Sequence, residues 1–79
     1  MQKDLRESKN YNMLVTRLLD YVNTMDAFRA LANGRAGIVY NLMEDCKEAL
    51  EPMGYSKESI ESLRPIIDSA VYDKWGPDL

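Results

Sequence analysis

The feature that most constrains the fold of this sequence is an apolar stripe with helical spacing. From residue 11 onward, apolar residues recur at alternating steps of four and three: Leu14, Leu18, Tyr21, Met25, Phe28 and Ala32. This is the period of one face of an α-helix, and no glycine or proline interrupts residues 11–32. The stripe therefore predicts an amphipathic helix over 11–32, with Ser8 or Asn10 as its N-cap.

The segment 32–37, Ala-Asn-Gly-Arg-Ala-Gly, leaves two interpretations open. Asn33-Gly34 followed by Gly37 is a turn signal, and each glycine costs about 1 kcal/mol relative to alanine inside a helix, which favours a break. The stripe nevertheless keeps its phase as far as Met53, which favours one helix of about 40 residues and roughly 60 Å. A helix that long cannot bury its stripe within 79 residues, so it would require an oligomer.

Two more helical segments follow. Residues 38–51 have one apolar and one acidic side, and Glu51-Pro52 ends the helix because the residue before a proline is pushed out of helical geometry. The last segment begins at Ser56 as an N-cap and stops at Gly76-Pro77. Pro65 lies inside it and predicts a kink or a split, because its ring crowds the preceding turn.

We therefore expect an all-α fold, a small helical bundle of two to three principal helices, with the last helix kinked at Pro65. A single domain spans 1–79, and its first ten residues, 1–10, could fray. The residues expected in the core or in an interface are Leu14, Leu18, Val22, Met25, Phe28, Leu31, Val39, Leu42, Met43, Cys46, Leu50, Ile60, Leu63, Ile67 and Val71.

Chain length makes association with another chain an expectation. At 79 residues, the apolar surface that can be buried barely offsets the conformational entropy lost on folding. Small domains add disulfides, a metal or a partner, and this chain has one cysteine, Cys46, and no histidine. A disulfide within the chain is excluded, and the ligands of a structural zinc site are missing. We expect a homo-oligomer and no cofactor.

The sequence indicates a cytoplasmic protein. Its first residues are charged, and no stretch approaches the roughly 18 to 20 apolar residues that cross a membrane. An unpaired cysteine suits a reducing compartment. No membrane association is expected.

Charge is distributed unevenly along the chain. Residues 1–36 hold six basic and four acidic residues, whereas residues 37–79 hold four basic and nine acidic residues. The net charge of −3 argues against nucleic acid as a partner, because nonspecific binding to phosphates requires an excess of Lys and Arg. A solvated surface accounts for the pattern, and so does attraction between basic and acidic faces, within one chain or between chains.

A candidate ligand site centres on the glycine-containing segment. Backbone N–H groups at the start of a helix beginning near Ile38 could hold a phosphate, with nearby arginines adding positive charge. The flanking strand and the Gly-Lys-Ser/Thr ending of a nucleotide-binding loop are missing, so close helix packing or a simple turn explains the glycines equally. The residues of this hypothesis are Arg29, Asn33, Gly34, Arg35, Gly37, Tyr11 and Tyr40.

Catalysis has little support in the sequence. The commonest general base, histidine, is missing, and Cys46 lies on an apolar helix face among carboxylates that disfavour its thiolate. Glu44 and Glu48 lie one helical turn apart, as acid-base pairs can, but a solvated helix face accounts for both of them. A helix-turn-helix outline around 51–55 is followed by an acidic helix, which does not suit DNA contacts. We expect no catalytic residues and no metal site.

Two binding hypotheses remain. The first is a non-enzymatic helical interaction protein that self-associates and binds or blocks a protein partner. Its size and acidic composition are common among phage and plasmid accessory proteins that inhibit host or defence machinery. The alternative is an oligomeric small-ligand binder that sequesters a phosphorylated molecule such as a nucleotide signal. The expected interface residues of the first hypothesis are Leu14, Leu18, Met25, Phe28 and Trp75.

Overall fold

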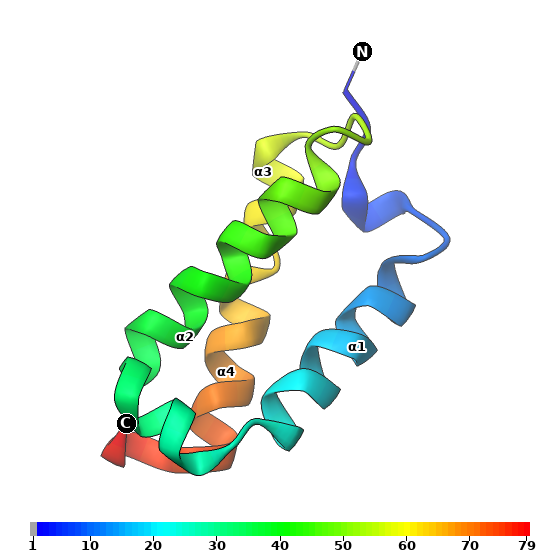
Figure 1. Cartoon of the computed structure of the whole chain (residues 1–79). Coiled ribbons are helices and arrows are strands. Elements are labelled where there is room, and N and C mark those ends of the chain that lie inside the picture. The colour runs from blue at the N-terminus through cyan, green and yellow to red at the C-terminus, as the bar shows by residue number, and fades with distance from the viewer. Residues whose placement is uncertain (1) are drawn as a thin grey trace.

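The computed structural model describes residues 2–79 and shows a small all-α bundle (Figure 1). The α-helices are α1 (Tyr11–Thr24), α2 (Ala27–Leu50), α3 (Lys57–Glu61) and α4 (Arg64–Trp75), with short 3-10 helices η1 (Leu5–Glu7) and η2 (Gly76–Asp78) near the two ends. The predicted all-α fold of two to three principal helices is confirmed. None of the helices in residues 2–79 combines the length and the apolarity that a membrane span needs.

Helix α4 is the common packing partner of the other two long helices. Both α1 and α2 pack against α4, whereas α1 and α2 make little direct contact with each other. In Figure 1, α4 lies behind the space that separates them. The bundle is therefore open on the side where one more long helix would lie between α1 and α2.

The core contains most of the residues that the periodicity predicts. The predicted residues that are buried are Val22, Val39, Leu42, Met43, Cys46, Leu50, Ile60, Leu63, Ile67 and Val71. Leu14, Leu18 and Met25 are half-buried against this core. Phe28 and Leu31 are exposed, so neither belongs to the core of the chain. Leu5, Ala30, Ile38 and Ala70 are buried and were not predicted.

The first helix ends earlier than predicted, at Thr24, so the continuous helix over 11–32 is wrong. Met25 and Asp26 are extended, and α2 begins at Ala27. An Asp26 carboxylate oxygen accepts hydrogen bonds from the N–H groups of Phe28, at 2.8 Å, and Arg29, at 3.4 Å. This side chain is a strong N-cap and satisfies two donors at the start of a new helix.

Helix α2 bends at Gly34, which decides between the two interpretations of the Asn-Gly segment. Gly34 has φ 72° and ψ 169°, a backbone region that only glycine occupies without strain. The residues on both sides, 27–33 and 35–50, remain helical. The chain therefore does not form the continuous helix of about 40 residues, because it is broken at both Asp26 and Gly34.

The last helix is interrupted where proline predicts it. The sequence Ser62-Leu63 separates α3 from α4, and Pro65 lies in the first turn of α4, where a missing N–H costs nothing. Ser56 caps α3 as expected and accepts from the N–H of Ser59 at 3.2 Å. The predicted kink of the last helix is thus confirmed as a break at residues 62–63 between α3 and α4.

The N-terminal segment is attached to the turn between α2 and α3. The Lys3 N–H donates to the Gly54 carbonyl, and the Ser56 N–H donates to the Lys3 carbonyl, both at 2.8 Å. Leu5 is buried in the core. Of the segment 1–10 that could fray, Met1 lies outside the described residues.

One carboxylate joins three helices through ion pairs. Glu61 in α3 lies 3.1 Å from the Lys47 ammonium of α2 and 2.8 Å from the Arg64 guanidinium of α4. Hydrogen bonds from Arg64 and then from Lys47 lower the pKa of Glu61 to about 2. The charged form of Glu61 is thus stabilised by folding.

We predict that Glu61→Gln lowers the free energy of unfolding at pH 7 and that this loss shrinks in acid. The pKa of Glu61 is lower in the folded chain than its ordinary value of 4.5, so its contribution is full above about pH 4.5 and disappears as pH falls to about 2. Because its side chain is 39% exposed, solvent screening limits the loss to below about 1 kcal/mol. Denaturant unfolding at several pH values measures it.

The control is Glu48→Gln, which removes an exposed carboxylate with no ion pair among the described residues. A difference between Glu61→Gln and the wild type that stays the same at pH 2 would contradict this account.

We also predict that Gly34→Ala destabilises the chain by about 1 to 3 kcal/mol, the cost of holding a β-carbon in this backbone region. No heavy atom lies within 4 Å of the position that the alanine β-carbon would take, so the cost comes from the backbone and not from a clash. Denaturant unfolding measures it. The neighbouring exposed substitution Asn33→Ala should change stability by less than about 0.5 kcal/mol, and equal effects of the two would refute the strained bend.

Candidate functional site

The predicted ligand site surrounds the bend of α2, and a backbone donor beside its glycines already has a protein partner. The N–H of Arg35 begins the helical segment after Gly34 and donates to the carbonyl oxygen of Leu79 at 3.2 Å. The C-terminal end of the chain lies beside this part of α2 (Figure 1). The segment after the bend thus receives a protein carbonyl at its N-terminus, where the hypothesis places a phosphate.

Arg35 is held by α4 and is not free to join the other arginine of the hypothesis. Its guanidinium donates two hydrogen bonds to the Asp68 carboxylate, at 2.8 and 2.7 Å, and lies 5.2 Å from the centre of the Tyr72 ring. The hydrogen bonds from Arg35 lower the pKa of Asp68, and those to Asp68 raise the pKa of Arg35. This two-point pair fastens the bend of α2 to α4.

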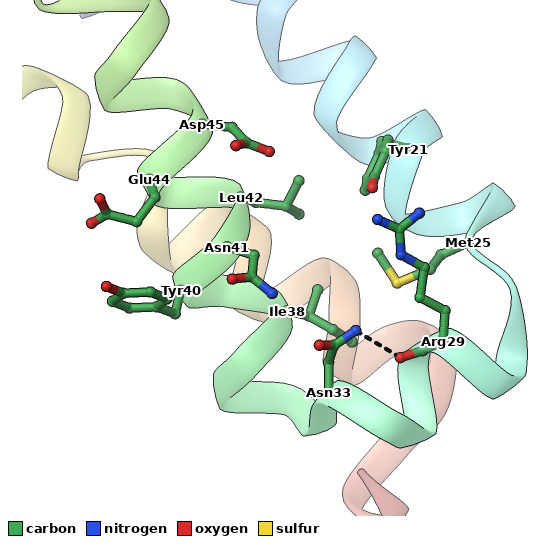
Figure 2. A pocket seen from close by; sticks show the side chains of 10 residues that line it. All are labelled: Tyr21, Met25, Arg29, Asn33, Ile38, Tyr40, Asn41, Leu42, Glu44 and Asp45. Atoms are coloured by element: carbon green, nitrogen blue, oxygen red, sulfur yellow. Dashed lines mark hydrogen bonds between the residues drawn. The ribbon is translucent and has the colours of Figure 1, made fainter.

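Three of the predicted residues, Arg29, Asn33 and Tyr40, line one hollow of about 430 Å³ (Figure 2). In Figure 2, Arg29 reaches toward Tyr21 of α1, whereas Tyr40 points away from α1. The Asn33 amide donates to the Arg29 carbonyl at 2.8 Å, so it is engaged locally. The remaining lining residues are Tyr21, Met25, Ile38, Asn41, Leu42, Glu44 and Asp45.

The charge of this hollow does not suit a phosphate. Arg29 is its single cation among the described lining residues, and Glu44 and Asp45 are two anions. Phosphate recognition requires an excess of positive charge or of free N–H donors. Tyr11 is remote from this hollow, because it is the first residue of α1 and the hollow lies at the last turn of that helix. The two ends of α1 are about 20 Å apart. The structure therefore does not bring the seven predicted ligand residues together.

The predicted interface residues divide into two groups. Leu14, Leu18 and Met25 lie on or just after α1 and are half-buried against the core, and Trp75 at the end of α4 is packed similarly. Phe28 is 84% exposed, and Leu31, one helical turn further, is 65% exposed. We call Phe28 and Leu31 the end patch, because they lie on the short segment 27–33 at one end of the bundle.

Sequence periodicity places Phe28 and Leu31 in the core or in an interface. They lie outside the core of the chain, and their place in an interface stays a prediction. In the segment 27–33, Ala30 is the buried residue, and the capping by Asp26 sets the direction in which the segment leaves α1. The signal in the sequence is the cluster Asn23-Thr24-Met25-Asp26, in which short polar residues compete for backbone groups. Thr24 does so, donating its hydroxyl to the Asp20 carbonyl at 2.9 Å.

Reactive groups are few among the described residues. Cys46 is buried, and burial, followed by the charge of Asp45, raises the pKa of its thiol. A protonated, buried thiol is a poor nucleophile. Cysteine and carboxylate side chains of the described residues do not gather in the groups of three or more that would hold a metal ion.

Comparisons of the chain with protein-family models, with curated proteins and with solved structures found no match.

We predict that Arg35→Glu lowers the melting temperature, because it removes the pair with Asp68 and places two carboxylates opposite each other. Adding Asp68→Arg in the same chain should restore part of the loss by re-forming the pair in reverse. Thermal unfolding followed by circular dichroism measures both. Lys9→Glu makes the same charge change at an exposed residue outside the ion pairs of the described residues and serves as the control. An unchanged melting temperature for Arg35→Glu would show that the pair is not structural.

Proposed function

We propose that this chain is a non-enzymatic helical interaction protein that self-associates and binds or blocks a protein partner in the cytoplasm. The observation that carries the proposal is the end patch, where Phe28 and Leu31 stand exposed one turn apart. Full burial of a phenylalanine or leucine side chain contributes about 1.5 to 3 kcal/mol each, so covering this pair with a partner would be strongly favourable.

The end patch is also held in a defined position. Its segment is capped by Asp26 at one side and ends at the Gly34 bend on the other, where Arg35 is fixed to α4. Ala30 anchors the segment in the core. A rigid apolar pair loses little conformational entropy on binding, which favours affinity.

The chemistry of the remaining residues supports a binding role over catalysis. The Cys46 thiol is buried, and its raised pKa keeps it protonated. A free thiol inside the fold also suits a reducing cytoplasm. The form of the action, blocking or adapting a partner, stays a prediction.

The alternative, an oligomeric binder of a phosphorylated molecule, has weaker physical support. Its arginines are separated, since Arg35 is paired with Asp68 while Arg29 lines a hollow that holds two carboxylates. It stays a hypothesis, and we do not adopt it.

We predict that the end patch contacts the partner directly. A photoreactive phenylalanine analogue at position 28 should crosslink in cells to one defined protein other than this chain, and an analogue at position 40 should not crosslink to that protein. Tyr40 is the matched control, because it is 61% exposed and points away from α1 (Figure 2).

The crosslinked protein is then purified and titrated by calorimetry. Phe28→Ser with Leu31→Ser should weaken its binding by about 30-fold or more, as expected for anchor residues, whereas Tyr40→Ser leaves it unchanged. Equal affinities of the double variant and the wild type would overturn the proposal that the end patch binds the partner.

A further inference from the structure

The space between α1 and α2 is a groove with side chains from both helices. We call it the α1–α2 groove. One end is a hollow of about 200 Å³ that includes Leu14 and Arg17 of α1 with Leu50 of α2. The other end is the hollow of about 430 Å³ that includes Tyr21 and Met25 with Leu42 and Asp45. Figure 1 shows the two helices separated along this length, and Figure 2 shows the second end from close by.

The groove exposes apolar side chains that the bundle leaves uncovered. Met13 and Tyr21 on α1 and Met53 just beyond α2 are exposed large hydrophobic residues that line its hollows. Leu14 and Met25 between them are only half-buried. The groove is therefore a continuation of the core that reaches the surface.

The arginines of the chain divide according to whether they line this groove. Arg6, Arg35 and Arg64 each form a two-point ion pair with a carboxylate of the same chain. The other two, Arg17 and Arg29, make no salt bridge among the described residues, and both line the groove.

Across the groove from Arg17, the α2 wall carries a carboxylate without an ion pair among the described residues, one helix segment beyond Arg29. Asp45 projects from α2 toward α1 (Figure 2) and makes no salt bridge with any described residue. Arg17 lies one turn after Leu14, at one end, and Asp45 lies one turn after Leu42, at the other. Because α1 and α2 run in opposite directions (Figure 1), each of these two residues lies one turn inward from its end of the groove, and we infer that Arg17 and Asp45 stand near its middle on facing walls.

We propose that the α1–α2 groove is covered by a second copy of this chain, docked groove to groove with the two-fold axis along the groove. This axis sets α1 of each copy over α2 of the other copy at the same level. Arg17 of each copy then meets Asp45 of the other, and Met13 meets Met53. This inference rests on the proposed function, since it names the surface of self-association.

Charge selects this arrangement over its main alternative. A two-fold axis across the groove would set α1 against α1 and α2 against α2, so that Arg17 meets Arg17 and Asp45 meets Asp45. Like charges in contact oppose association strongly in an interface. The axis along the groove instead makes the surface complementary to itself, as a symmetric dimer requires.

The whole long face of the molecule is close in size to one side of a standard interface. The molecule measures 41 × 18 × 17 Å, so its long face covers roughly 700 Å² in projection. A standard interface buries about 800 Å² on each partner. The end patch, in contrast, lies at one end of the bundle and is not required by this dimer.

The test uses charge reversal and sedimentation velocity. The wild type should be a dimer, and Arg17→Asp or Asp45→Arg alone should weaken dimerisation by about a hundredfold in the dissociation constant, because each places two pairs of like charges in contact. Both changes in one chain restore the dimer. Mixing the two single variants should give a heterodimer, since each then supplies the charge that the other requires.

Charge changes outside the groove serve as controls. Lys57→Asp and Asp73→Arg make the same charge changes at exposed residues outside the groove and should leave the dimer intact.

A monomeric wild type, or a dimer unaffected by Arg17→Asp, would overturn the second copy as the occupant. A monomer whose groove variants lose the crosslinked partner would assign the groove to that partner. The double variant at Phe28 and Leu31 should stay dimeric, so loss of partner binding there tests the end patch and not the dimer.

Discussion

The arrangement depends on α4, which packs against both α1 and α2. Val71 and Ile67 of this helix are fully buried, and Ala70 is buried beside them. A helix has a limited apolar face, and α4 uses its face to hold α1 and α2 apart from each other. The same packing that creates the core therefore leaves a side of the bundle open, and this open side is the α1–α2 groove.

Helical periodicity predicts which faces are buried better than where helices end. The burial of Val22, Leu42 and Ile60 follows from spacing alone, because a residue in phase with the stripe reaches the core. The same phase continues through Met25 and Phe28, although the backbone leaves helical geometry between them. Whether the helix stops there depends on Asp26, whose carboxylate accepts hydrogen bonds from two backbone N–H groups. The spacing of apolar residues does not show that a side chain competes with the helix for these N–H groups.

Long-range pairing explains why the candidate ligand site was harder to predict than the fold. Arg29 and Arg35 look equivalent in the sequence, six residues apart beside an Asn-Gly pair. Arg35 pairs with Asp68, a residue 33 positions away that reaches it only through the packing of α4 on α2. Arg29, on the other side of the bend, lines the groove without an ion pair among the described residues. The Pro65 split was predictable because its cause lies within a few residues of the break.

The two exposed apolar surfaces differ in how they arise, and this difference separates their roles. The groove exposes apolar side chains that are continuous with the core, so covering it adds to stability. A dimer formed there would stabilise the folded chain by mass action. The end patch contributes almost nothing to folding, since Ala30 is the buried residue that anchors its segment in the core. Phe28 and Leu31 can therefore be replaced with little effect on folding. A surface that folding does not require, held in position between a cap and a bend, suits the partner-binding site that we propose.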